Sequence, residues 1–106
     1  MNISFRRFEI LLPLQFNDGS AVPDDVIADA ILQLREHFGA VSCETQKIHG
    51  VWTHEAEVYR DELIRLFVDA PDSTESRQFF VEFKEYLKGR FNQLDIWMTT
   101  YPIEVL

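Results

Sequence analysis

The sequence predicts an α+β fold, with a four-stranded antiparallel sheet that carries two helices on one face. Residues 5–16 alternate between apolar and other side chains with the period of two that a half-buried strand shows. Residues 23–38 and 74–91 place apolar side chains at helical spacing. Three further segments are rich in strand-forming residues: 40–48, 56–69 and 94–106. The predicted order is therefore strand–helix–strand–strand–helix–strand.

The first strand is predicted from its alternation and from the turn that follows it. The next four residues, from Asn17 to Ser20, each tolerate a positive φ or bond to their own backbone, so they predict a turn. The apolar face of the strand comprises Phe8, Ile10, Leu12, Leu14 and Phe16.

The first helix is predicted to begin at Pro23 and to end before Gly39. Proline suits the first helical turn, and the carboxylates of Asp24 and Asp25 complement the positive end of the helix dipole. Glycine is the preferred residue just past the last turn. The apolar stripe of this helix is Ile27, Ala30, Ile31, Leu34 and Phe38.

The two middle strands, 40–48 and 56–69, are predicted to be joined through the region from Gly50 to Glu55. The second of them is apolar on both faces towards its end, which is typical of a central strand. The residues concerned are Val58, Leu63, Ile64, Leu66, Phe67 and Val68.

The second helix has the clearest start signal in the sequence, which runs from Pro71 to Glu75. Either Asp72 or Ser73 is suited to cap it, and Asp72 with Glu75 has the spacing of a capping box. We expect this helix to anchor the core, because it presents large apolar side chains at helical spacing: Phe80, Phe83, Leu87 and Phe91.

The last strand, from Leu94 to Leu106, is predicted to have Ile96 and Met98 on one face and Trp97, Thr99, Tyr101 and Ile103 on the other. The complete element order is the split βαβ, or ferredoxin-like, pattern. The rule for right-handed crossovers leaves few other ways to wind it. A chain of this length is expected to form one domain, residues 1–106.

In this fold the helices cover one face of the sheet, so the other face meets water or a partner. We expect this open face to carry an apolar patch larger than monomers normally expose. We therefore predict a homo-oligomer, first a two-fold dimer and second a trimer. The open face is predicted to carry Phe5, Leu11, Tyr59, Leu63, Phe67, Trp97, Tyr101 and Ile103, of which Tyr59, Phe67, Trp97 and Tyr101 are the candidate ligand or oligomer contacts.

One stretch resembles a known family. From Trp52 to Val68, the tryptophan, the strand after it and the Glu62–Leu63 pair resemble the middle hairpin of CutA-type divalent-cation tolerance proteins, which are trimeric relatives of the PII signalling fold. The resemblance covers under a fifth of the chain, and Val68–Asp69 stands where that family has a Lys-Thr pair. The resemblance implies the architecture of the fold, and no site residue is carried over from that family.

Charge and composition exclude several classes of protein. The chain has 18 acidic and 10 basic side chains and a formal charge of −8, which disfavours nucleic acid and anionic lipid as partners. Apolar runs stay far below the roughly 18 residues that a membrane span needs. A lone cysteine gives no sign of an oxidising compartment. We therefore expect a soluble cytoplasmic protein with neither a nucleic-acid nor a membrane partner.

The sequence contains no recognised catalytic motif. Its four glycines, at positions 19, 39, 50 and 89, are too far apart for a phosphate-binding loop. It also lacks the CxxC, HExxH and GxSxG patterns. We predict no cofactor and favour a protein that is not an enzyme, although a site built from scattered residues would escape this test.

The best polar cluster in the sequence comprises His49, His54, Glu55 and Glu57. Imidazole and carboxylate groups at a hairpin tip are able to hold a divalent metal ion or to transfer a proton. The spacing matches no known ligand motif, so a solvated hairpin tip is the alternative interpretation.

One cysteine and one histidine each have a structural and a functional interpretation. Cys43 is predicted to be a small buried hydrophobe, and His37 to complement the dipole at the end of the first helix. A nucleophilic pair of the two is the alternative.

Charged residues alternate along the third strand. Pairing of Arg60 with Glu62, or of Asp61 with Arg65, is favoured over a substrate-binding arginine, because ion pairs on strands are common.

Three hypotheses of different class follow. The first is a small homo-oligomeric binding or regulatory module, with a small molecule as an option for its ligand. The second is a cofactor-free enzyme of the dimeric α+β barrel type, whose pocket would be lined by Tyr59, Trp97, Tyr101 and either His49 or His54. The third is a protein that handles divalent metal ions, which are the one metal cofactor the sequence suggests.

Overall fold

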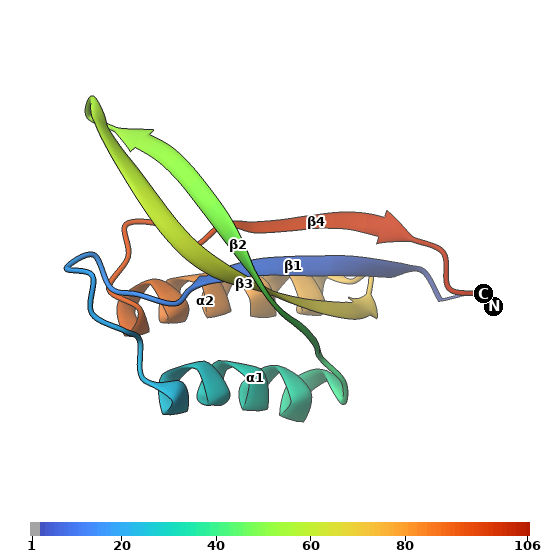
Figure 1. The fold of residues 1–106 in the computed structure, drawn as a ribbon. Helices are drawn as coiled ribbons and strands as arrows, with labels where there is room; N and C mark the ends of the chain where they lie inside the picture. The colour runs from blue at the N-terminus through green and yellow to red at the C-terminus, as the bar shows by residue number, and fades with distance from the viewer. Residues whose placement is uncertain (1–2) are drawn as a thin grey trace.

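The strands and helices follow the predicted order (Figure 1). The computed structural model describes residues 3–106. In chain order the elements are β1 (Phe5–Pro13), α1 (Asp24–Phe38), β2 (Ser42–His54), β3 (Glu57–Pro71), α2 (Thr74–Arg90) and β4 (Met98–Ile103). Neither helix is both long and apolar enough to cross a membrane, within the part of the chain described.

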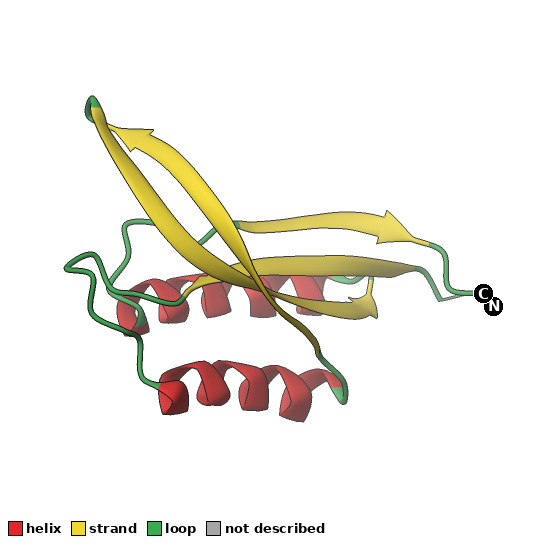
Figure 2. Cartoon of the chain, viewed as in Figure 1, coloured by secondary structure: helices red, strands yellow, loops and turns green. Residues whose placement is uncertain are grey.

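The four strands form one sheet in the order β2-β3-β1-β4, and every neighbouring pair is antiparallel. The predicted central position of β3 is confirmed, since it pairs with β1 on one side and β2 on the other. Both helices lie on the same side of the sheet (Figure 2). The opposite face is therefore left without a helical cover.

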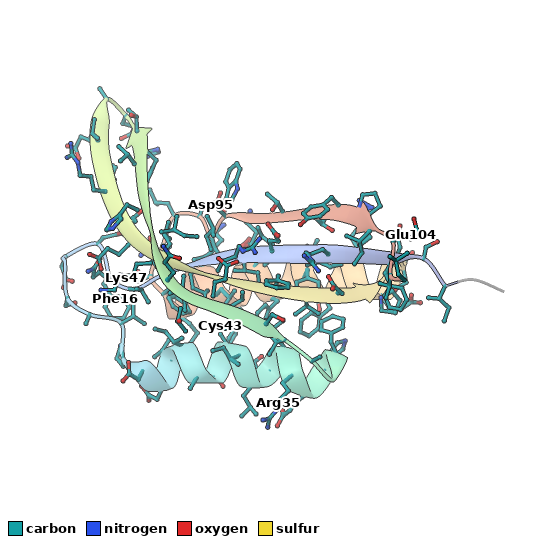
Figure 3. The ribbon with its side chains drawn as sticks, turned by 45° about the vertical axis from the view of Figure 1, so that its right-hand side comes forward. Phe16, Arg35, Cys43, Lys47, Asp95 and Glu104 are labelled. Carbon is teal, nitrogen blue, oxygen red and sulfur yellow. The ribbon has the colours of Figure 1, made fainter. Side chains whose placement is uncertain are left out.

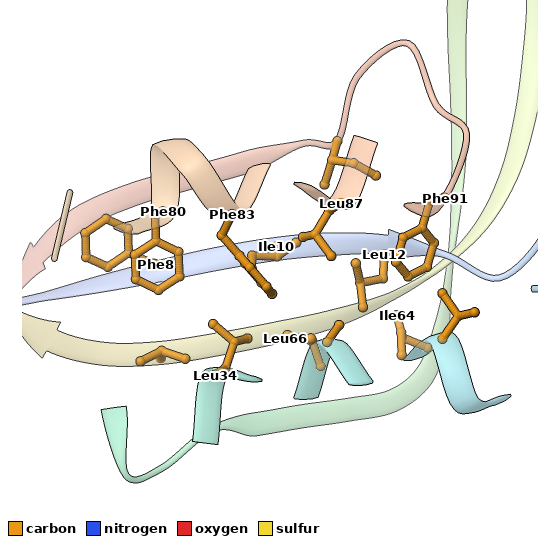
Figure 4. Packing of buried hydrophobic residues seen from close by; sticks show 14 of the residues in the cluster. Phe8, Ile10, Leu12, Leu34, Ile64, Leu66, Phe80, Phe83, Leu87 and Phe91 are labelled. Atoms are coloured by element: carbon orange, nitrogen blue, oxygen red, sulfur yellow. The ribbon is translucent and has the colours of Figure 1, made fainter. Parts of the chain in front are cut away.

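The core lies between the sheet and the two helices, both of which contribute buried residues to it. The four side chains predicted to anchor it, Phe80, Phe83, Leu87 and Phe91, are all buried (Figure 4). The rings of Phe8 on β1 and Phe80 on α2 stack with their centroids 4.0 Å apart. The aromatic spacing of this helix therefore predicted the core correctly.

The apolar stripe of α1 faces the core with one addition to the prediction. Val26, Ala30 and Leu34 are its buried residues, and Val26 was absent from the predicted stripe. The helix ends as expected at Gly39, which has φ 86° and donates its N–H to the carbonyl of Arg35 at 2.8 Å. Glycine adopts this left-handed conformation without a steric penalty.

Of the two residues predicted to cap α2, Ser73 holds the N-cap position, so the capping box of Asp72 with Glu75 is not formed. Ser73, not Asp72, is the N-cap residue, and its hydroxyl accepts a hydrogen bond from the backbone N–H of Ser76 at 3.1 Å. The carboxylate of Asp72 instead lies 3.7 Å from Arg6. A one-residue shift of this kind is common, because serine and aspartate cap almost equally well.

Two strands are shorter than predicted. β1 ends at Pro13 rather than at residue 16, because the chain turns back there: Phe16 N–H donates to Ser20 and Val22 N–H donates to Leu14. β4 begins at Met98 rather than at residue 94. The segment 91–97 that precedes it is irregular, and its last residue bonds to the end of β1 through the N–H of Leu11.

The hairpin between β2 and β3 is longer than predicted. The region from Gly50 to His54 continues β2, and the turn consists of Glu55 and Ala56, with φ 50° and 66°. These two residues give no turn signal in the sequence, since asparagine and glycine are the usual occupants of such positions. The result is a two-stranded extension of the sheet, residues 49–62, which curves away from the helices (Figure 1). We call it the arm.

Candidate ligand-binding cleft

The open face of the sheet carries the residues that the alternation predicted. Phe8, Ile10 and Leu12 on β1, and Ile64 and Leu66 on β3, are buried towards the helices. Their neighbours in each strand therefore point to the other side. By the strand register, seven of the eight predicted residues of the open face lie there, and Trp97, which directly precedes β4, is 64% exposed.

Charged side chains interrupt this face, which corrects the expectation of one apolar patch. Glu9 on β1 accepts hydrogen bonds from Arg65 on β3 at 2.5 Å and from the hydroxyl of Tyr101 on β4 at 2.8 Å. Arg65 also donates to Glu44 on β2 at 2.6 Å. One network therefore ties together all four strands across the middle of the open face.

A second charged group lies further along the same face. Arg7 donates two hydrogen bonds to Asp69, at 2.7 and 3.0 Å, and this pairing raises the pKa of the guanidinium above its ordinary value. The ring of Phe67 lies between Arg7 and Arg65, whose Cζ atoms are 4.6 and 4.9 Å from its centroid. Phe67, a candidate contact residue, is therefore engaged by cations of its own chain.

The open face ends in a cleft of about 890 Å³ beneath the arm. Its floor consists of Leu11 and Pro13 at the end of β1 and Leu63 on β3. One wall is the inner side of the arm, and the other is the segment 93–97 with Lys88 of α2. A cleft of this size with apolar and aromatic lining is typical of small-molecule sites.

The arm wall is built by pairing across its two strands. Trp52 on β2 lies opposite Tyr59 on β3, and their rings stack with centroids 4.5 Å apart. The indole Nε1 of Trp52 also donates a hydrogen bond to the carboxylate of Asp61 at 2.5 Å. The hydroxyl of Tyr59 donates to Glu57 at 3.0 Å, which raises the pKa of Tyr59 above its ordinary value.

The opposite wall is held in place by one buried residue. Ile96 is 1% exposed, so it fixes the segment against the core while Leu94 and Trp97 beside it are 63% and 64% exposed. The carbonyl of Trp97 accepts a hydrogen bond from the backbone N–H of Leu11 at 3.0 Å, which ties this wall to the floor. Asp95, labelled in Figure 3 just before β4, lies 3.0 Å from Lys84.

Gly50 lines the cleft at the base of the arm, beside the floor residue Leu63. A Cβ at this position would lie 2.9 Å from the Cδ1 atom of Leu63 on the floor. The glycine therefore lets the floor side chain approach the β2 backbone closely.

The predicted polar cluster is divided by the arm. His54 and Glu57 are direct partners in the ladder and share the inner side, whereas His49 pairs with Glu62 on the outer side. Within residues 3–106, no group of three or more His, Cys, Asp or Glu side chains is placed to hold a metal ion. His54 Nε2 lies 3.9 Å from Glu55 at the tip, and His54 alone of the four lines the cleft.

Cys43 and His37 lie outside the cleft. Cys43 is exposed on β2, which corrects the prediction of a buried thiol, and partial desolvation raises its pKa above the ordinary value (Figure 3). His37 stacks on Phe79 of α2 with ring centroids 4.1 Å apart. A raised thiol pKa disfavours nucleophilic chemistry at Cys43.

The predicted ion pairs on β3 were wrong in their partners. Arg65 pairs with Glu9 and Glu44 rather than with Asp61, and Glu62 pairs with Lys47 at 3.3 Å rather than with Arg60. The pairs form between strands, not along one strand. Asp61 instead lines the cleft, where its carboxylate accepts the hydrogen bond from the Trp52 indole.

The sequence named Tyr59, Trp97 and His54 as pocket residues of an enzyme, and all three line the cleft. It also named Tyr101 and His49, which do not line it. It missed Asp61, Pro13 and, apart from Trp97, the segment 93–97. Of these, only Asp61 had a usable signal: locating the turn at 55–56 would have placed it on the inner side of the arm, because the turn decides which residues of the arm face each other.

Comparisons with known proteins give the architecture. No family model matches the sequence, and no curated protein matches it. Among solved structures, a phage SAM lyase in complex with S-methyl-5′-thioadenosine has a TM-score of 0.68 at 14% identity, covering 99% of this chain and 92% of that one. The fold is ferredoxin-like.

Two divalent-cation tolerance proteins share this ferredoxin-like fold. CutA1 from Thermus thermophilus has a TM-score of 0.64 at 17% identity, covering 95% of this chain and 85% of that one. CutA1 from Oryza sativa has a TM-score of 0.65 at 11% identity, covering 97% of this chain and 83% of that one. The predicted fold class and the predicted CutA-type likeness are thus confirmed at the level of the fold.

Proposed function

We propose that this chain is a self-associating module that binds a small organic molecule in the cleft beneath the arm. One observation carries the proposal: about 890 Å³ of space with an apolar floor and aromatic walls lies on the face without helices. Small-molecule sites combine this kind of lining with a few polar groups that orient the ligand. Asp61 and His54 are polar groups of that kind here.

A nucleoside thioether is the first ligand to test. The phage SAM lyase that shares the fold was solved with S-methyl-5′-thioadenosine, a molecule with a planar base and an apolar methylthio group. The rings of Trp52, Tyr59 and Trp97 offer stacking surfaces for a base, and Leu11 and Leu63 offer apolar contact for the remainder.

The binding experiment is a calorimetric titration of the full chain with S-methyl-5′-thioadenosine. We expect saturable binding that Trp52→Ala weakens about tenfold, as the loss of a stacking partner should. Tyr101→Ala is the matched control, because Tyr101 is aromatic and on the open face but does not line the cleft. Equal losses in both variants, or no binding to the parent chain, would count against the proposed site.

Self-association is proposed from the arm and the open face together. An isolated two-stranded hairpin is marginally stable in water, yet the arm extends beyond the sheet with Val51 and Val58 exposed by 66% and 55%. Trp97 and Tyr101 are further exposed aromatics on the open face. A second copy that covers these residues would stabilise the arm, with a two-fold dimer as the first expectation and a trimer as the second.

Light scattering on the purified chain tests this part. We expect the mass of a dimer or a trimer of the 12.5 kDa chain, and we expect Trp97→Glu to shift the mass towards that of the monomer. Val81→Glu is the control, since Val81 is 57% exposed on α2, on the side of the sheet away from the open face. A strict monomer at concentrations of about 50 μM, well above the dissociation constant of a stable complex, would overturn self-association.

A divalent cation is the second candidate ligand, and the names of the two CutA1 proteins that share the fold motivate it. His54 lies near Glu55 and pairs with Glu57 at the tip of the arm, but no three such side chains are placed to hold a metal ion among residues 3–106, so further ligands would have to come from a second copy. Elemental analysis of protein purified without chelator tests it. Stoichiometric metal that is lost in His54→Ala and kept in His37→Ala would support a site at the tip, and trace metal would reject it.

A further inference from the structure

The charged groups that line the cleft differ in how they are paired. Lys88 lies 3.1 Å from Glu85, and Asp95 lies 3.0 Å from Lys84. Asp61 has no basic side chain within ion-pair distance among residues 3–106. The cleft therefore contains one carboxylate whose charge the chain itself leaves unmatched.

Three aromatic side chains line the same cleft: Trp52, Tyr59 and Trp97. Trp52 holds the Asp61 carboxylate through its indole N–H, and this bond uses only the Oδ2 atom. Tyr59 stacks on Trp52, and the exposed ring of Trp97 lines the facing wall. An aromatic face attracts a cation through its quadrupole, and quaternary ammonium groups are typical ligands of sites walled by such rings.

We propose that the cleft selects an organic cation that carries a quaternary ammonium group, with Asp61 as the counter-charge and the three rings as the wall. This inference rests on the proposed ligand-binding function and names its ligand class. Two features favour a cation over an anion. The free oxygen of Asp61 repels anions, and the formal charge of −8 raises the local concentration of cations.

The choice between a metal ion and an organic cation follows from the lining. A small hard cation needs several oxygen ligands at short distance, whereas Asp61 is flanked by the rings of Trp52 and Tyr59 and by the apolar floor. A quaternary ammonium group has no hydrogen-bond donor to satisfy and is covered by methyl groups. Its apolar surface matches the floor while its charge matches Asp61.

The test compares choline with 3,3-dimethyl-1-butanol, which has the same shape but a carbon in place of the charged nitrogen. The two tryptophans of the chain both line the cleft, so their indole N–H signals in NMR spectra report on binding there. We expect choline to bind about tenfold more tightly than the alcohol, as a cation beside aromatic rings and a carboxylate should. High salt should lower the ratio of the two affinities, because salt screens the charge of choline and leaves the shape of both probes unchanged.

The variant Asp61→Asn tests whether the Asp61 carboxylate causes the preference for choline. The side-chain amide that this substitution introduces keeps an oxygen acceptor for the Trp52 indole, so the wall should persist while the charge is lost. We expect the choline preference to fall close to one in this variant and to be kept in Asp69→Asn, because Asp69 is on the same face, is paired with Arg7 and does not line the cleft. Circular dichroism confirms that each variant is folded.

Three results would overturn the inference: equal binding of the two probes, no binding of choline, or an unchanged preference in Asp61→Asn. The salt titration of the parent chain needs no variant, so a folding defect does not compromise it. Binding of S-methyl-5′-thioadenosine without any choline preference would leave the proposed function standing and remove only the ligand class.

Discussion

The indole Nε1 of Trp52 donates a hydrogen bond to the carboxylate of Asp61 at 2.5 Å, across the two strands of the arm. The two residues are not direct partners in the ladder, because Trp52 lies opposite Tyr59 and Gly50 lies opposite Asp61. The bond therefore runs diagonally and comes on top of the stack between the Trp52 and Tyr59 rings. Together these contacts give the arm a fixed inner side, which is the wall of the cleft.

Loss of that acceptor should destabilise the chain. We expect Asp61→Ala to lower the free energy of unfolding by about 1 kcal/mol, because the indole N–H loses its partner in a half-buried position. Asp61→Asn, which retains an oxygen, should cost less than half as much. Urea denaturation measures both, and identical losses in the two variants would show that the hydrogen bond is not the cause.

Removal of a core ring on α2 should be far more costly. Phe83 is 4% exposed, so Phe83→Ala should lower the free energy of unfolding by about 3–5 kcal/mol through lost burial and a residual cavity. Val81→Ala, on the exposed side of the same helix, should change it by less than about 0.5 kcal/mol. Denaturant titration of the two variants gives the comparison. A loss below about 1 kcal/mol for Phe83→Ala would mean that the helix presents a different face.

Two glycines should respond to alanine with opposite signs. Gly89 lies within α2, and a Cβ there would meet no atom within 4 Å, so Gly89→Ala should stabilise the chain by about 0.5–1 kcal/mol. Gly39 has φ 86° at the end of α1, where an L-residue is strained, so Gly39→Ala should destabilise it by about 1 kcal/mol. Thermal unfolding of both variants tests the pair, and changes of the same sign would contradict it.

Acid should weaken the contact between the two helices. The hydroxyl of Tyr86 on α2 donates to Asp29 on α1 at 2.7 Å, and Gln33 donates to the same oxygen, so the pKa of Asp29 lies below its ordinary value of 3.8. A carboxylate with a lowered pKa in the folded state stabilises that state above about pH 4, and the contribution is lost as the pH falls through the lowered value.

This pH dependence is measurable by chemical denaturation between about pH 6 and pH 2.5 at low protein concentration. We expect Tyr86→Phe to reduce the loss of unfolding free energy at acid pH, because the group that most stabilises the charged form of Asp29 is then missing. The pKa of Asp18 is also lowered, by hydrogen bonds from Ser20 in a separate turn. Its contribution to the pH dependence should therefore remain in Tyr86→Phe. An unchanged acid limb in Tyr86→Phe would refute the assignment.

Local periodicity predicted the elements and the inner face of the sheet. The alternation in β1 and the aromatic spacing of α2 each depend on residues a few positions apart, and burial of an apolar face follows directly from such spacing. Phe8, Ile10, Phe80 and Phe83 are therefore buried as expected. The element order then left few ways to wind the sheet.

Turns and strand ends were less predictable. Gly50 resembled a turn residue but lies within β2, where its missing Cβ makes room for Leu63. Glu55 and Ala56 adopt positive φ although neither residue type favours it. The strands on either side decide this turn, since their pairing gains more than the left-handed conformations cost.

The sequence by itself determined that this chain folds as six elements around an aromatic core, and that one sheet face stays free of helices. Only the tertiary structure decided what that free face contains. Ion pairs such as Arg65 with Glu9 join residues 56 positions apart, and the cleft combines the arm with the segment 93–97, which follows it only after the whole of α2. The strand register and the path of the chain determine these contacts between distant residues, and no local sequence pattern encodes them.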